Sequence, residues 1–154
     1  MVAAISRRTV LVVAAFLGQA CFAQNSGQSK VIASIQRTAV AALNFREADA
    51  AGFSRARANF TADGWNDFLT HMQGFLDLKG APTFTSSFAV KHDARFLDER
   101  NGLLHVRIPG SLTQSSKLGR TVYDRAAIAV YVDNDGKIER LEQVTCSGAS
   151  KACE

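Results

Sequence analysis

Runs of like charge are missing from this sequence, since no five consecutive residues carry the same sign. The formal net charge is +4, and Arg7 and Arg8 contribute two of those charges from a segment interpreted below as a leader. Without them about +2 remains, which gives no argument for nucleic acid or an anionic membrane as partner. Apolar residues make up 47% of the 154 residues, a globular composition with enough chain for one domain.

Linear catalytic and binding motifs are also missing. The sequence has no His-x-x-x-His pair, no glycine-rich phosphate loop, no G-x-S-x-G and no Cys–His nucleophile pattern. We therefore predict no catalytic residue, no cofactor-binding residue and no metal ligand, and no cofactor.

A long apolar run is missing too. The run from Thr9 to Gly18 is shorter than the roughly 20 residues that span a bilayer. Preceded by Arg7 and Arg8 and followed by "CFA", which ends at Ala23, it predicts a secretory leader over residues 1–23 and a periplasmic mature protein. Two alternatives stay open: a retained anchor, and lipidation at Cys21. Residues 24–29 are polar and predict a flexible tether.

Cysteine is scarce, and its placement is informative. Of three cysteines, Cys21 lies in the predicted leader, so a cleaved chain keeps only Cys146 and Cys153. Outside the cytoplasm such a pair favours a disulfide. A metal site is disfavoured because no histidine lies nearby, and a redox motif needs closer spacing.

Helical periodicity dominates the first half of the mature chain. Apolar residues recur at helical spacing in Lys30–Phe45, and a second helix is expected over about Ala48–Asn59. A third helix starts at Thr61, whose hydroxyl can cap it, and continues to Leu76. Gly80 and Pro82 are expected to end it.

The apolar period changes to two after Pro82, which indicates strands. We predict one strand from Thr83 that continues toward Phe96, a second over Leu104–Ile108, a third over Thr121–Val132 and a fourth after the turn at Asp133–Gly136. The polar segment Ser111–Arg120 is expected to be a loop, with strand ends inside it as the alternative.

This order of elements predicts an α+β fold. Three N-terminal helices pack on a curved four-stranded antiparallel sheet, in one domain over residues 30–154. The layout resembles the cone-shaped nuclear transport factor 2-like (NTF2-like) fold, whose members often enclose a pocket. The residues that could titrate in such a pocket are His71, His92, His105, Asp93, Asp124, Tyr123 and Tyr131.

The strand pattern constrains these candidates. His105 is expected on the face opposite to Leu104 and Val106, while Tyr123 and Tyr131 share parity but stand far apart on one strand. His71 is expected at the edge of the apolar stripe of the third helix. None of these residues forms an evident dyad.

A second resemblance is carried by "ALNF" and, fifteen residues later, "NFTADGWNDFLTHM". These segments resemble the periplasmic domain of the IcmL/DotI family of type IVB secretion and conjugation systems. The matching residues are Asn44, Phe45, Phe60, Thr61, Gly64, Trp65 and Phe68.

The resemblance implies a non-enzymatic scaffold in the periplasm that contacts other envelope proteins of a secretion system. It brings no catalytic residue. Full members carry a transmembrane helix where this sequence has the predicted leader, so membrane association requires an uncleaved leader or a lipid on Cys21. No nucleic acid partner is expected, and homo-oligomerisation stays open. Exposed sheet edges and Ser111–Arg120 are the candidate contact surfaces. The alternatives are an NTF2-like small-molecule carrier and an isomerase- or dehydratase-type enzyme, because cone-fold enzymes use scattered residues.

The same residues have a physical interpretation of their own. Phe60 precedes the cap residue Thr61 and is expected to pack against Trp65 as a hydrophobic staple. Gly64 lowers helix propensity, so we expect it to permit a close approach by a neighbouring element.

Overall fold

The computed structural model describes residues 27–146 and Cys153. The predicted leader, residues 1–23, and the first part of the predicted tether lie outside the described residues. The chain divides into two units, residues 1–31 and 32–154, and the second unit contains the predicted domain almost entirely.

Three helical segments precede the sheet, as predicted. Residues 27–43 are helical, and within the second unit this helix buries Ile35, Ala39 and Leu43. Helix α2 spans Ala50–Arg55 and continues as a 3-10 turn, η1, over Ala56–Asn59. Helix α3 spans Ala62–Met72 and ends in the 3-10 turn η2 over Gln73–Phe75.

The end of the third helix differs from the prediction. Gly80 is not its cap, because the helix has already ended at Phe75 and Gly80 lies in a separate turn with a φ of 74°. Asp77 organises this turn, since its Oδ1 accepts from the backbone N–H groups of Ala81 and Lys79, each at 2.8 Å. These two bonds favour the ionised carboxylate and hold the pKa of Asp77 below its ordinary value of 3.8.

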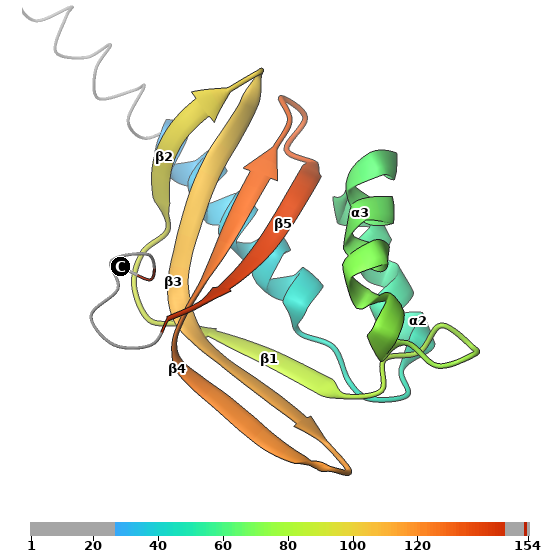
Figure 1. The fold of residues 1–154 in the computed structure, drawn as a ribbon. Helices are drawn as coiled ribbons and strands as arrows, with labels where there is room; N and C mark the ends of the chain where they lie inside the picture. Colours follow the sequence, from blue (N-terminus) through green and yellow to red (C-terminus); the bar gives the residue numbers. More distant parts are fainter. Residues whose placement is uncertain (1–26, 147–152, 154) are drawn as a thin grey trace, which may run out of the picture. The chain divides into compact units, whose positions relative to one another are not determined.

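The sheet has five antiparallel strands, one more than predicted. They are β1 Thr85–Val90, β2 Arg95–Arg100, β3 Leu103–Ser116, β4 Gly119–Val132 and β5 Ile138–Thr145. The order is β1-β3-β4-β5, and β2 also pairs with β3. The predicted α+β class with helices on an antiparallel sheet is confirmed (Figure 1).

The extra strand arises because one predicted strand is two. The alternation from Thr83 toward Phe96 breaks at residues 91–94, and the two halves pair with different parts of β3. Strand β1 pairs with residues Gly110–Ser115 and β2 with Leu103–Arg107. A long partner strand can carry two short neighbours end to end on the same edge.

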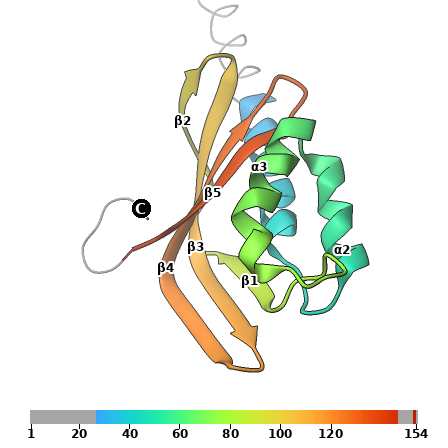
Figure 2. The ribbon, with the colours of Figure 1, turned by 45° about the vertical axis from the view of Figure 1, so that its right-hand side comes forward.

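Ser111–Arg120 is not the predicted loop. Strands β3 and β4 continue through it as a hairpin, and only Lys117 and Leu118 form the turn. The hairpin extends beyond β5, and β3 and β4 bend at mid-length (Figures 1 and 2). Seen nearly edge-on, the sheet has α2 and α3 on one side only (Figure 2).

The core fills the space between the helices and that face of the sheet. Strands β3 and β4 contribute alternate residues with no exposed surface, including Val106, Ile108, Ile128 and Val130. The helices contribute an aromatic cluster in which Phe53 and Phe60 each contact Trp65. This inner face carries the candidate site.

Candidate interaction site

The segment after the first helix seals the edge formed by β1. Phe45 and Ser86 exchange two backbone hydrogen bonds of 3.1 and 2.9 Å. The Asn44 side-chain oxygen accepts from the Phe88 N–H at 2.7 Å. The Phe45 ring is buried against Phe53 and Phe84, with ring centroids 5.4 and 5.2 Å away. This junction satisfies donors that an edge strand would otherwise expose.

The start of α3 is hydrogen-bonded to the first residues of β5. The Thr61 N–H donates to the Ile138 carbonyl at 3.0 Å, and the Thr61 hydroxyl donates to Glu139 Oε2 at 2.7 Å. The same hydroxyl oxygen caps the helix by accepting from the Gly64 N–H at 3.0 Å. Phe60 and Trp65 pack with ring centroids 5.4 Å apart, so the predicted staple is confirmed.

Gly64 lies where the helix meets the β5 backbone. A Cβ placed there would be 2.3 Å from the Ile138 oxygen and 2.7 Å from the Glu139 oxygen. Both neighbours are backbone atoms, and the Ile138 oxygen also accepts from the Thr61 N–H, so neither can rotate away. The β5 backbone therefore approaches the start of α3 closely, as expected. This approach explains why the helix has glycine, the residue without a Cβ, at position 64.

The remaining motif residue, Phe68, lies one turn beyond Trp65 and stacks on Phe60 at 5.3 Å. All seven residues quoted above for the family resemblance therefore lie at two junctions that tie the helices to the sheet. Their arrangement is structural.

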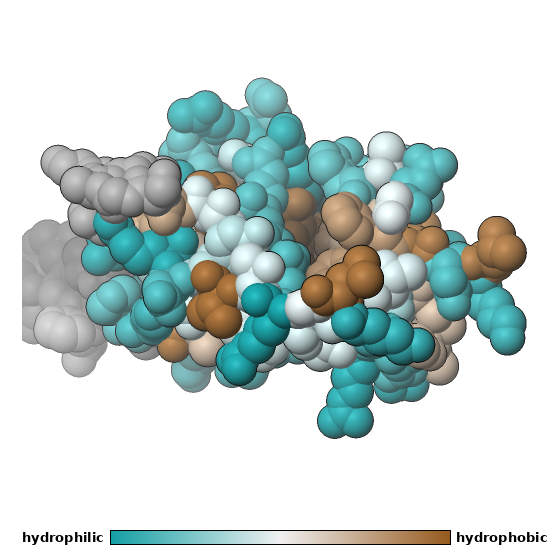
Figure 3. Space-filling model, turned by 60° about the horizontal axis from the view of Figure 1, so that its bottom comes forward, coloured by the Kyte–Doolittle hydropathy of each residue, from teal (hydrophilic) through white to brown (hydrophobic). Residues whose placement is uncertain are grey.

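Below these junctions the inner face opens into a groove of about 1100 Å³. Helix α3, β1, the β3–β4 hairpin and β5 form its walls. Its floor is apolar and comprises Leu43, Phe45, Phe68, Met72, Phe84 and Leu141. Phe75 and Leu118 lie at its rim, 53% and 99% exposed. Figure 3 shows several brown apolar patches at this end of the molecule, with white and teal residues between them.

The groove contains few groups that could do acid–base chemistry. Of the seven titratable candidates from the sequence, His71 alone is among the lining residues. Its side chain is 73% exposed, and its Nδ1 lies 2.8 Å from the Asp67 carbonyl one turn back. Glu47, Lys117 and Glu142 also line the groove, and sequence reasoning did not select them.

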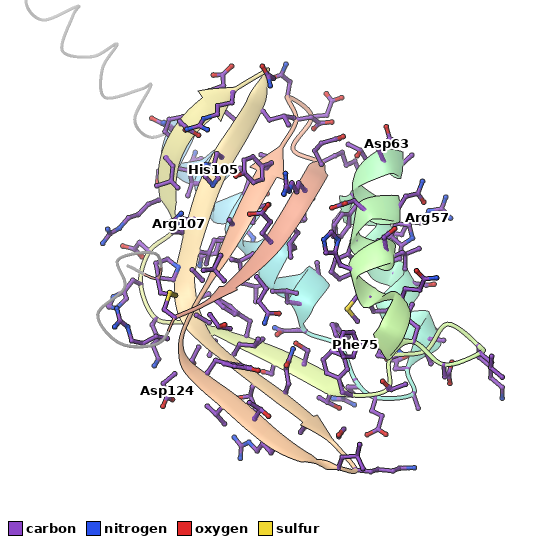
Figure 4. The ribbon with its side chains drawn as sticks, in the orientation of Figure 1. Arg57, Asp63, Phe75, His105, Arg107 and Asp124 are labelled. Atoms are coloured by element: carbon purple, nitrogen blue, oxygen red, sulfur yellow. A yellow bond between two sulfur atoms is a disulfide. The ribbon has the colours of Figure 1, made fainter. Side chains whose placement is uncertain are left out.

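His105 lies on the opposite face of the sheet, as its strand parity predicts. Its Nδ1 is 3.1 Å from Asp98 Oδ1, and its ring stacks on Tyr131 with centroids 4.3 Å apart. Its Nε2 is buried and has no hydrogen-bond partner among the described residues. Figure 4 shows His105 and Arg107 on β3, far from Phe75 at the groove.

The predicted shared parity of Tyr123 and Tyr131 is wrong. Gly110 pairs with Ala126 while Leu112 pairs with Tyr123, so β4 has one extra residue in between. This bulge reverses the alternation. Tyr123 packs against the core, whereas Tyr131 lies beside His105 on the outer face.

The last three candidates are on the surface. His92, Asp93 and Asp124 are all exposed, and none of them lines the groove. Within residues 27–146 and Cys153, no group of three or more His, Cys, Asp or Glu side chains could hold a metal ion. No helix in the described part of the chain is long and apolar enough to cross a membrane.

A disulfide joins Cys146 to Cys153 directly after β5, as expected, with a Cα–Cα distance of 6.1 Å. Cys153 is buried, and its sulfur lies 3.8 Å from the Val144 carbonyl. The disulfide and this contact hold Cys153 beside the end of β5.

Two solved structures share this fold. The periplasmic domain of DotI superposes with a TM-score of 0.57 and 18% identity, covering 75% of this chain and 94% of that one. An IcmL-like type IV secretion system protein from Legionella pneumophila subsp. pneumophila str. Philadelphia 1 superposes with a TM-score of 0.59 and 10% identity, covering 80% and 96%. No protein-family model matches the sequence. No curated protein matches it either.

Proposed function

We propose that this chain is a non-enzymatic interaction domain of the bacterial periplasm that acts as an IcmL/DotI-like scaffold within a type IV secretion system. The observation that carries the proposal is the likeness of fold to two such proteins, which extends over 94% and 96% of their chains. The motif residues support it, because the features expected from the resemblance lie at the junctions that hold this fold together.

The distribution of titratable groups favours a scaffold over an enzyme. A cone-fold enzyme needs an acid or base aimed into its pocket. Here the half-buried histidine, His105, is on the other face of the sheet, and the groove histidine, His71, is exposed at the rim. The groove itself favours a contact surface for a partner.

Recovery from the native envelope tests the proposal. The chain with a C-terminal affinity tag is expressed in its own host, cross-linked in intact cells and purified. We expect other secretion subunits to be recovered with it, in amounts well above those recovered with a tagged periplasmic control protein. Recovery of the chain alone would contradict the proposal.

Mass spectrometry of the same material tests export. We expect a mature chain that begins after Ala23. A mass corresponding to a lipid on Cys21, or to the intact leader, would instead indicate membrane attachment.

The groove supports one alternative, carriage of an apolar small molecule, because its floor is apolar and its volume is about 1100 Å³. Native mass spectrometry of the purified protein discriminates the two. A carrier should retain a copurifying small molecule, whereas a scaffold should give the mass of the chain alone.

A further inference from the structure

Part of one sheet edge, on β4, has no neighbouring strand among the described residues. Strand β5 pairs with β4 only from Ala126 to Val132. The last backbone bond on this side joins the Cys146 N–H to the Arg125 carbonyl at 3.0 Å. Among the described residues, no strand pairs with the outer edge of residues 119–125 of β4.

Two other stretches of the sheet edge are bound by neighbouring segments. Asn44 and Phe45 seal β1, and Thr61 binds the start of β5. Lys91 Nζ donates a hydrogen bond of 2.7 Å to the Asp124 carbonyl. The stretch of the β4 edge considered below is therefore residues 119–123. An edge of this kind exposes N–H and C=O groups of alternate residues and is a template for another strand.

The open edge borders the apolar groove. Gly119 and Thr121 line the groove, and so do four consecutive residues of β5, Leu141–Val144. Consecutive strand residues point to opposite faces of the sheet. A groove lined by all four residues therefore follows the outer edge of β5 as well as its inner face. A chain lying along this edge would place every second side chain over the apolar floor.

Charge at this edge indicates the chemistry of the occupant. Residues 111–123 contain two basic side chains, Lys117 and Arg120, and no acidic side chain, for a net charge of +2. Lys117 and Arg120 are both exposed. Thr121 faces the groove, so Arg120 and Val122 face outward by alternation. Acidic residues at the outward positions of an added strand would lie beside Arg120.

We propose that the groove binds an extended segment of a partner protein, with alternating apolar and acidic residues, which adds a strand to the edge of β4 at residues 119–123. The segment lies along the edge of β4 beyond the end of β5 at Thr145. Main-chain hydrogen bonds supply the pairing, and the apolar floor selects alternate side chains. The inference rests on the proposed function, because it assigns the contact surface that a scaffold requires.

Fluorescence anisotropy with a defined probe tests the pairing. The probe is a short fluorescein-labelled peptide in which valine and glutamate alternate, added to the mature chain. Two matched peptides serve as controls: one has lysine in place of glutamate, and one is N-methylated at every second backbone nitrogen. We expect the acidic peptide to bind, the lysine peptide to bind about tenfold more weakly, and the methylated peptide not to bind.

Protein variants locate the site. Lys117→Glu with Arg120→Glu should weaken binding of the acidic peptide about tenfold, since two favourable contacts become repulsive. Arg37→Glu with Arg57→Glu makes the same change of charge at two exposed positions on the helices and should leave binding unchanged. Amide chemical shifts should move at residues 119–123 and at Leu141–Val144. Melting curves check that both double variants remain folded.

Three results would overturn the proposal. Equal binding of the methylated peptide would show groove occupancy without strand addition. A dimer in light scattering that Lys117→Glu with Arg120→Glu dissociates would show that a second copy pairs with this edge. Sedimentation with phosphatidylglycerol vesicles that depends on the same two residues, without peptide binding, would assign the edge to a membrane surface.

The proposal and the proposed function can fail separately. If secretion subunits are recovered with the chain but the peptides do not bind, the strand-addition site is wrong and the scaffold role stands. If the peptides bind as expected but the envelope yields no secretion subunit, the site stands and the assignment to a secretion system is wrong.

Discussion

Replacing Gly64 by alanine adds one methyl group where α3 meets β5. That carbon would lie 2.3 Å from the Ile138 oxygen, whereas ordinary contacts begin at 3.4 Å, so the helix and strand must separate by about 1 Å. The Thr61–Ile138 and Thr61–Glu139 hydrogen bonds, 3.0 and 2.7 Å long, span the same gap and would lengthen with it.

The magnitude follows from opposing contributions to the free energy of unfolding. Removing glycine from a helix stabilises it by about 1 kcal/mol. Overpacking costs about 1–3 kcal/mol, and weakening two hydrogen bonds costs about 1 kcal/mol each. The Gly64→Ala protein should therefore be about 2–4 kcal/mol less stable than wild type, and its melting temperature about 5–15 °C lower. Gly64→Leu should be worse.

Urea and thermal unfolding, followed by circular dichroism and by Trp65 fluorescence, measure the effect. Trp65 is the one tryptophan of the chain and is 7% exposed, so its emission reports this junction. Gly74→Ala is the matched control, because Gly74 lies in η2 and a Cβ there has no neighbour within 4 Å. Equal stability of the Gly64→Ala and Gly74→Ala proteins would refute the close-approach argument.

Three further perturbations test other parts of the fold. Asn44→Ala should cost about 1–3 kcal/mol in urea unfolding, because the Phe88 N–H loses its acceptor; Asn44→Asp keeps an acceptor oxygen and should cost less, and equal losses would contradict this role. Reducing the Cys146–Cys153 disulfide should lower stability by about 2–3 kcal/mol, and a Cys146→Ser/Cys153→Ser protein should melt identically with and without reductant. The lowered pKa of Asp77 implies stability that is present above the ordinary value of 3.8 and lost as the pH falls through the folded-state pKa. Asp77→Asn should therefore flatten the acid limb of the stability–pH curve, and an unchanged limb would contradict this contribution.

Local chemistry made the start of α3 predictable. A threonine cap, an aromatic residue on either side of it and helical apolar spacing all act within one or two turns, so neighbouring residues decide the outcome. The cap and the staple were identified correctly, whereas Phe75, expected on the buried face, is 53% exposed. Gly64 was harder, since the sequence indicated that something approaches the helix without indicating that it is the β5 backbone.

The alternation of apolar and polar residues was less informative about which strands pair with each other. The alternation beyond Thr83 was continuous, yet its two halves pair with different parts of β3. The polar segment Ser111–Arg120 resembled a loop because its side chains are small and hydrophilic, although its backbone is fully paired in a hairpin. Backbone pairing depends on strands far away in sequence, and side-chain polarity does not report it.

The sequence by itself determined the helices, the antiparallel sheet, the cysteine pair and the absence of a linear catalytic motif, because each depends on neighbouring residues or on composition. Tertiary structure alone decided which faces meet. It put His105 and His71 on different sides of the sheet and reversed Tyr123 relative to Tyr131 through one bulged residue. It also left residues 119–123 of β4 beside an apolar groove, with no neighbouring strand on their outer edge in the part of the chain that the structure describes. These features arise from register and from contacts between distant segments, and local residue patterns do not encode either.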